Sequence, residues 1–365
     1  MGSGALTDTA AHRDFAIRPS AAILTAMTAA LPAVRPPRSR TWIAQLGLLF
    51  VVLAMLIALS AAGGNRFLNR GNLIEILGTS MSYYAIMAVG MTIVIVSGGI
   101  DISVGAIMAL AAILTAWVLG RMEYQASAWA VLPVAIGLPI LIGLVCGVIN
   151  GALIVALRLH PFIVTLGTLS IFRGLVNVVP PAKTMPVMPN KVPFAFMDGL
   201  MRAKIFNAQA VPMIVMLVIV VIGYVYLRHL VPGRNTYAIG GNEEAARLSG
   251  IRVARLKLGC YAISGVCAGI AGMVLLGFYG RASATTGEGY ELTVVAAAVV
   301  GGASLSGGRG TAIGALLGTL VIALIENGIS ILQWNQEYRR VIIGSAIIVA
   351  VSLDRLSEAL GSRSR

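Results

Sequence analysis

Long apolar segments without a charged side chain recur along this sequence. Residues 43–62 and 211–227 are two of them, and both fall in the range of about 17–25 residues that a helix needs to cross the hydrocarbon core of a bilayer. Hydrocarbon offers no hydrogen-bonding partner to the backbone, so a continuous apolar segment crosses it as a helix. We therefore predict an all-α polytopic membrane protein with about ten transmembrane helices.

The composition supports this fold class. Hydrophobic residues make up 58% of the chain and charged residues only 11%, whereas about 25% of an average soluble domain is charged. We expect a flexible cytoplasmic tail at residues 1–41, a transmembrane domain at residues 42–357 and a second cytoplasmic tail at residues 358–365. The predicted helices are 43–62, 74–97, 103–120, 128–157, 161–179, 211–230, 256–279, 292–306, 311–333 and 338–354.

The net charge of +13 arises from 27 Lys and Arg residues against 14 Asp and Glu residues. In a soluble protein this excess would suggest nucleic acid. Here the basic residues lie mainly in predicted loops and tails, where they orient membrane helices. We expect membrane lipid around the chain, no nucleic-acid partner and both termini in the cytoplasm, although Arg339 and Arg340 fit this orientation poorly. The three cysteines, which show no metal-ligand spacing and imply neither a disulfide nor a metal site, are Cys146, Cys260 and Cys267.

A carboxylate interrupts the apolar background in residues 97–105, Ser-Gly-Gly-Ile-Asp-Ile-Ser-Val-Gly. Paired glycines such as Gly98 and Gly99 loosen a helix and allow close approach of another backbone. A carboxylate at membrane depth is costly, so Asp101 requires a partner or a polar cavity there. A second interpretation is that the glycines form a tight turn and Asp101 caps the next helix. The two interpretations are compatible.

A similar interruption follows another apolar run, at residues 301–310. It keeps the pattern Gly-Gly-x-x-(Ile or Leu)-Ser when Gly98 is matched with Gly301, Gly99 with Gly302, and Ser103 with Ser306. Paired interruptions in the two halves of a transporter mark a site formed by broken helices. We therefore predict an internal pseudo-repeat with a substrate pathway at its two breaks. The candidate pathway residues are Gly98, Gly99, Asp101, Ser103, Gly301, Gly302, Ser304 and Ser306.

Residues 231–257 form the only long, strongly polar loop on the predicted inner side. Asn242 is a good N-cap, Glu243 and Glu244 suit the positive end of a helix, and Gly250 can end one. We predict a short surface helix here. A membrane-parallel connector is one interpretation. A docking helix for a cytosolic partner is preferred, because exposed acidic and small residues suit contact with protein better than with anionic lipid.

Several polar residues lie inside predicted helices. Arg173 is expected to pair with a carboxylate or with backbone carbonyls, and Asp101 and Glu326 are its candidate carboxylate partners. Asn150 and Asn327 are expected to bridge helices through amide hydrogen bonds.

These motifs together resemble the permease subunits of bacterial ABC importers for monosaccharides, the ribose, xylose, arabinose and galactose type. The resemblance extends from about residue 45 to residue 357, and its main stretches are 90–95, 98–105, 150–151, 160–168, 173–174, 233–234, 240–246, 290–292, 301–304, 307–311, 326–328 and 354–356.

The resemblance implies an inner-membrane dimer with a second permease copy or a paralogue. It further implies a separate ABC ATPase subunit, which binds ATP and Mg, and a periplasmic sugar-binding protein. Residues 243–251 would form the coupling helix that is seated in the ATPase. The implied ATPase-coupling residues are Asn242, Glu243, Glu244, Ala245, Ala246, Arg247, Leu248 and Gly250.

The chain contains no Gly-x-x-x-x-Gly-Lys-Ser/Thr sequence, so it does not cradle nucleotide phosphates in the P-loop manner. We also find no pairing of a nucleophile with a base, and we expect no catalytic residue and no cofactor in this chain. A neutral monosaccharide or polyol as cargo agrees with the few membrane charges. Two alternatives stay open. One is an ABC permease for another solute, such as branched-chain amino acids or a small signalling sugar. The other is an ATP-independent secondary transporter or channel, which would have no obvious use for the polar surface helix.

Overall fold

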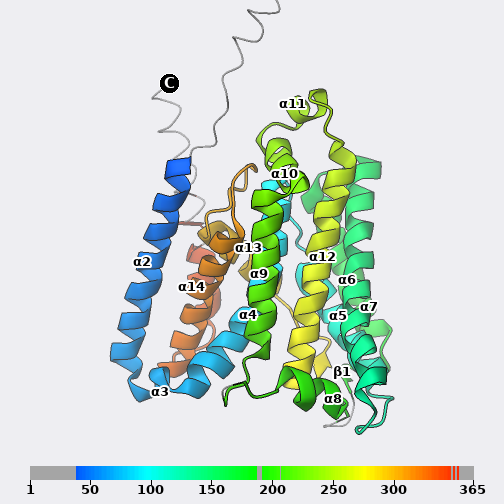
Figure 1. Ribbon diagram of the computed structural model, residues 1–365, viewed down its shortest axis with the longest axis vertical. Helices are drawn as coiled ribbons and strands as arrows, with labels where there is room; N and C mark the ends of the chain where they lie inside the picture. The colour runs from blue at the N-terminus through cyan, green and yellow to red at the C-terminus, as the bar shows by residue number, and fades with distance from the viewer. Residues whose placement is uncertain (1–37, 187–190, 206, 347, 350–351, 353–365) are drawn as a thin grey trace, which may run out of the picture. The chain divides into compact units, whose positions relative to one another are not determined.

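The chain folds into a bundle of long helices (Figure 1). The computed structural model describes residues 38–186, 191–205, 207–346, 348–349 and 352, with side chains from residue 45 onwards. Residues 1–37 and 353–365, which include most of the two expected tails, lie outside the described residues. The chain divides into two units, Met1–Ile43 and Ala44–Arg365, and the side chains discussed below belong to the second.

The described elements follow one another along the chain with short connections. In order they are α2 (Arg38–Gly63), α3 (Asn65–Leu68), the π-helix η1 (Gly71–Gly78), α4 (Thr79–Val96), α5 (Val104–Leu119), α6 (Ala128–Leu157), α7 (Pro161–Val178), β1 (Thr184–Met185), α8 (Phe194–Phe196), the π-helix η2 (Met197–Met201), α9 (Val211–His229), α10 (Val231–Gly241), α11 (Glu243–Leu248), α12 (Val253–Tyr279), β2 (Ala282–Ser283), α13 (Tyr290–Val300) and α14 (Ala312–Ile331). Residues 338–346 are also helical. Strands β1 and β2 pair antiparallel.

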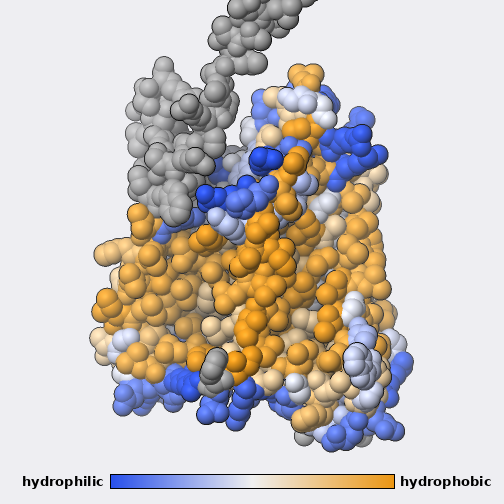
Figure 2. All heavy atoms as spheres, viewed as in Figure 1, coloured by the Kyte–Doolittle hydropathy of each residue, from blue (hydrophilic) through white to orange (hydrophobic). Residues whose placement is uncertain are grey.

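Seven helices within the described residues are long and apolar enough to cross a membrane, and α5 and α13 are shorter apolar helices. The helix at residues 338–346 coincides with the start of the tenth predicted segment. On the face drawn in Figure 2, an apolar band lies between hydrophilic edges, as lipid on the sides and water at the ends require. The prediction of a polytopic α-helical membrane protein is confirmed.

Helix α4 lies at the centre of the bundle. In the most apolar window of Gly71–Val96, 94% of the residues are buried, against 6% in the corresponding window of Gln45–Gly63 in α2. A helix that is apolar on every side is suited to complete burial by other helices. Close packing depends on small residues elsewhere as well. A β-carbon on Gly265 of α12 would lie only 2.1 Å from the carbonyl oxygen of Gly143 in α6, so these two backbones are in direct contact.

The helix predicted at residues 292–306 is shorter than expected. Helix α13 ends at Val300 after 11 residues, which corresponds to about 16 Å of rise, roughly half of a hydrocarbon core of about 30 Å. Two glycines follow, and Gly302 has a φ of +92°, which a helix interior does not tolerate. The expected break after Val300 is therefore present, and residues 301–311 connect it to α14.

Candidate substrate pathway and coupling surface

The two predicted breaks are built on the same type of helix stop. After α4, Gly98 has a φ of +85° and the N–H of Gly99 donates to a carbonyl in the last turn of α4 at 3.0 Å. After α13, Gly302 has a φ of +92° and the N–H of Ala303 donates to a carbonyl in the last turn of α13 at 3.0 Å. Both are Schellman turns, in which a left-handed glycine satisfies the final carbonyls of a helix.

The turns correct the predicted register of the repeat by one residue. The left-handed positions are Gly98 and Gly302, so Gly98 corresponds to Gly302 and not to Gly301. The proposed pairing of Gly99 with Gly302 is wrong for the same reason. The sequence pattern gave the wrong register because two adjacent glycines stand at the second break. The first has right-handed helical dihedral angles and the second has the left-handed conformation. The second connection is also longer than the first.

Asp101 is fully buried just before α5. Its carboxylate accepts hydrogen bonds from the N–H and the hydroxyl of Ser103, at 3.1 and 2.6 Å, and from the hydroxyl of Ser264 in α12 at 3.0 Å. The amide of Asn150 in α6 donates to Ser103 Oγ at 2.7 Å and to Asp101 at 3.4 Å. The tight turn and the polar surroundings expected for Asp101 are therefore confirmed. The expected capping role is wrong, because the N-cap of α5 is Ser103 and Asp101 accepts from the N–H of Ser103, which precedes the helix. We call Asp101, Ser103, Asn150 and Ser264 the Asp101 cluster.

The role of Ser264 was not predicted from the sequence. A serine inside an apolar helix carries no sequence signal of its own, and its partner lies far away along the chain. The bridging role expected for Asn150 is confirmed, since its amide links α6 to the start of α5. Asn327 likewise bridges helices, because its amide exchanges hydrogen bonds of 2.7 and 3.2 Å with the amide of Asn72.

Arg173 does not pair with either of its candidate carboxylates. Its guanidinium donates to the carbonyl oxygens of Ala284 and Thr286, at 3.2 and 2.7 Å, so the backbone interpretation is confirmed. Asp101 is held by uncharged donors, and Glu326 forms an ion pair of 2.9 Å with a different arginine, Arg339. Sequence separation gives no indication of which arginine reaches a given carboxylate.

The second break has no carboxylate. Ser304 is buried and shares a hydrogen bond of 2.8 Å with the exposed Ser306. A β-carbon on Gly301 would lie 2.2 Å from the carbonyl oxygen of Gly314 in α14. Close backbone packing thus joins the second break to α14.

The two breaks, which are far apart in the sequence, meet in space. The N–H of Gly308 donates to the carbonyl of Val96 at 3.0 Å. A β-carbon on Gly307 would lie 3.1 Å from the Cα atom of Gly98. Among the candidate pathway residues, the exposed ones are Gly98, Gly302 and Ser306, and the fully buried ones include Asp101, Ser103 and Ser304.

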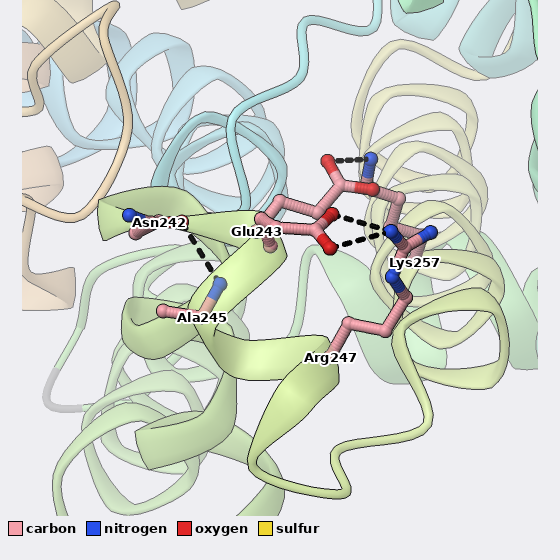
Figure 3. Close-up of polar contacts among 6 residues, drawn as sticks. Asn242, Glu243, Ala245, Arg247 and Lys257 are labelled. Carbon is pink, nitrogen blue, oxygen red and sulfur yellow. Dashed lines mark hydrogen bonds and ion pairs between the residues drawn. The ribbon is translucent and has the colours of Figure 1, made fainter.

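The short helix expected in the polar loop is α11, which lies beyond the ends of α9 and α12 in Figure 1. The side chain of Asn242 accepts a hydrogen bond of 2.9 Å from the N–H of Ala245, as an N-cap does (Figure 3). The helix ends at Leu248, and Gly250 has a φ of +82°. The predicted start and end of this helix are confirmed. The preceding helix, α10, was not predicted.

The surface of α11 is polar and open. Arg247 pairs with Glu244 and Lys257 pairs with Glu243, both through contacts of 2.7 Å (Figure 3). The hydrogen bonds that Arg247 donates to the carboxylate of Glu244 raise the pKa of Arg247, so this guanidinium stays charged. Only Ala246 is buried in this helix, and Leu248 is 80% exposed.

Comparisons with known proteins agree with this architecture. The sequence matches the family described as "Branched-chain amino acid transport system / permease component" over residues 72–351. It is 40% identical over 310 residues to the ribose import permease protein RbsC of Bacillus subtilis. This alignment covers 85% of this chain and 92% of the relative. It is 37% identical over 308 residues to the D-allose transport system permease protein AlsC of Escherichia coli, with coverages of 84% and 90%. It is 36% identical over 317 residues to the fructose import permease protein FruG of Bifidobacterium longum, with coverages of 85% and 90%.

No solved structure matches the chain. The family match covers most of the helical bundle, and the relatives match over nearly their whole length. The chain therefore belongs to the family of permease components of bacterial ABC importers, and it is a multi-pass protein of the inner membrane.

Proposed function

We propose that this chain is the permease subunit of an ATP-driven importer that moves a neutral monosaccharide or polyol into the cytoplasm. The proposal takes its substrate class from the relatives, whose names specify ribose, D-allose and fructose. The few charges in the described bundle support it, because Glu326 is paired with Arg339 and Arg173 is bound to carbonyls. An uncharged solute needs no fixed charge along its path.

The observation that carries the proposal is the open surface of α11. A helix of six residues is too short to be stable alone, yet α11 has a capped start and two surface ion pairs. Leu248 at its end is 80% exposed and is open to contact with a partner. We assign α11 as the coupling helix that is seated in a separate ABC ATPase subunit, which holds ATP and Mg.

The remaining partners follow from the same assignment. If α11 meets the ATPase, its end of the bundle faces the cytoplasm, and the proposal puts both chain termini in the cytoplasm as well. The opposite end then receives sugar from a periplasmic binding protein. A second permease copy or a paralogue completes the transporter.

In this mechanism the permease chain offers a transient, weakly polar path. High-affinity recognition is left to the binding protein, because a tight site in the permease would retain the sugar when the path opens inward. The pathway residues at the breaks after α4 and α13 supply hydroxyl and backbone groups that match sugar hydroxyls. Nucleotide favours one state of the ATPase pair, and this differential affinity shifts the permease between its outward and inward forms.

The test is ATP-dependent sugar uptake into proteoliposomes that contain the permease, the ATPase and the binding protein. Replacing both Glu244 and Arg247 by alanine should uncouple ATP hydrolysis from uptake and leave membrane insertion intact. Unchanged uptake in this double variant would remove the assignment of α11.

A charge exchange separates contact from local stability. In the variant Glu244→Arg with Arg247→Glu the ion pair is kept but its polarity is reversed. If the pair only stabilises α11, this variant should recover part of the uptake lost in the double alanine variant, but less than the wild-type uptake because the exchange opposes the helix dipole. If the ATPase contacts these two charges, uptake should stay as low as in the double alanine variant.

The same assay tests the alternatives. Uptake of leucine in place of sugar would indicate an importer for branched-chain amino acids, in line with the family description. Uptake without ATPase or ATP would indicate a secondary transporter. A thermal-shift screen of sugars and polyols on the cognate binding protein would then identify the cargo.

A further inference from the structure

Helix α10 (Val231–Gly241) connects the proposed coupling helix to the bundle. One residue, Asn242, separates it from α11, and one residue, Leu230, separates it from α9. The loop that leads from α13 to α14 lies beside α10 at the α11 end of the bundle (Figure 1). Any displacement of α11 must therefore be absorbed at Asn242 or passed on to α10.

The last turn of α10 is packed on backbone atoms of both breaks. A β-carbon on Gly240 would lie 1.8 Å from the carbonyl oxygen of Val96 and 2.5 Å from the N atom of Gly308. These are the two atoms of the hydrogen bond that joins the breaks, at 3.0 Å. Backbone atoms cannot rotate away as a side chain does, so Gly240 cannot move towards either break without displacing it.

One turn earlier, α10 forms a second link. The hydroxyl of Tyr237 donates to the carbonyl oxygen of Gly310 at 2.7 Å. The next residue, Thr311, is the N-cap of α14, since its hydroxyl accepts from the N–H of Gly314 at 2.9 Å. Tyr237 is thereby connected to the start of α14, and Gly240 to the end of α4.

We infer that Gly240 and Tyr237 are positioning residues that pass a displacement of α11 to both helix breaks at once. The inference rests on the proposed coupling role of α11. Because Val96 and Gly308 are hydrogen-bonded to each other beneath Gly240, the two breaks move together and neither opens alone. Packed contacts of this kind have discrete arrangements and transmit small shifts as switches.

The first variant is Gly240→Ala, which inserts a methyl group between α10 and the breaks. Gly241→Ala is its matched control, because a β-carbon there meets no heavy atom within 4 Å. In the reconstituted importer, we expect sugar uptake per ATP hydrolysed to fall about tenfold in Gly240→Ala and to stay at the wild-type value in Gly241→Ala. Thermal unfolding of both purified variants separates lost coupling from lost folding.

The second variant is Tyr237→Phe, which removes one hydroxyl and keeps the ring. We expect uptake per ATP to fall about threefold, with an unchanged unfolding temperature. If Gly240→Ala keeps the wild-type ratio of sugar uptake to ATP hydrolysis, the inference is overturned. If Gly240→Ala does not insert into the membrane, a wild-type ratio in Tyr237→Phe overturns it. Absence of ATP-dependent uptake in the wild-type importer would instead overturn the proposed function, and the inference with it.

Discussion

The breaks after α4 and after α13 end their helices in the same way but are held in place differently. At the first, the buried carboxylate of Asp101 accepts hydrogen bonds from the N-cap of α5, from α6 and from α12. At the second, the chain has left-handed glycines and close backbone contacts in place of a carboxylate. Hydrogen bonds to its own buried side chain fix the first connection to its neighbours, whereas the second is contacted on its backbone, by close packing and by the hydroxyl of Tyr237. A common turn can thus be held through a buried side chain at one break and through backbone atoms at the other.

The largest effect is expected from removing the carboxylate at the first break. Asp101→Ala should lower the free energy of unfolding by about 3–5 kcal/mol, because each buried donor left without an acceptor costs about 1–3 kcal/mol. Thermal or denaturant unfolding in detergent measures the loss. Asp101→Asn keeps one acceptor oxygen and should lose less. A wild-type unfolding midpoint in Asp101→Ala would show that the Asp101 cluster does not fix the break.

The next largest losses of unfolding free energy are expected at two glycines that lie against other elements, one at each break. A β-carbon on Gly301 would meet the backbone oxygen of Gly314 at 2.2 Å, whereas one on Gly99 would meet the hydroxyl of Tyr261 at 2.3 Å. Overpacking costs about 1–3 kcal/mol. We expect Gly301→Ala to lie at the upper end of that range and Gly99→Ala at the lower end, because the tyrosine side chain can shift. Equal losses in the two unfolding curves would contradict the proposed dependence of the second break on backbone packing.

Much of this comparison could be predicted from the sequence. Segment length and the absence of charge were sufficient to locate the long membrane-spanning helices, since a bilayer imposes one length and one backbone solution. They gave no signal for α10. The paired glycines at residues 98–99 and 301–302 correctly located both breaks. The ends of α11 followed from Asn242 and Gly250, because caps act on local backbone groups.

The rest depended on contacts between segments that are distant in the sequence. Nothing in the pattern distinguishes Ser264, which binds Asp101, from other small residues of α12. The partners of Arg173 were backbone carbonyls, which every residue carries. The register of the two turns was misassigned because two adjacent glycines both permit a positive φ, and only the hydrogen-bond pattern shows which one adopts it.

Because both breaks have the same turn, we expect alanine to cause equal and moderate losses of stability at the left-handed glycine of each. Gly98 and Gly302 both have a left-handed backbone, and a β-carbon at either position would meet no heavy atom closer than 3.9 Å. Alanine at each position should therefore cost only the strain of this backbone, about 1–2 kcal/mol. Unequal losses of unfolding temperature would show that the two turns are not equivalent. D-Alanine, introduced by chemical ligation, should restore stability at both positions.

The smallest effect is expected at Ser306, the residue that the sequence pattern matches with Ser103. Ser306 is exposed and shares a hydrogen bond of 2.8 Å with Ser304. Because water can replace its hydroxyl there, Ser306→Ala should lower the free energy of unfolding by about 1 kcal/mol or less. Ser103 is fully buried and bonds both Asp101 and Asn150, so Ser103→Ala should lose about 1–3 kcal/mol under the same conditions. Unfolding curves of the two variants, recorded side by side under the same conditions, measure both losses. If both serines proved equally costly, a side chain would hold the second break as firmly as the Asp101 cluster holds the first, and the contrast between the two breaks would fail.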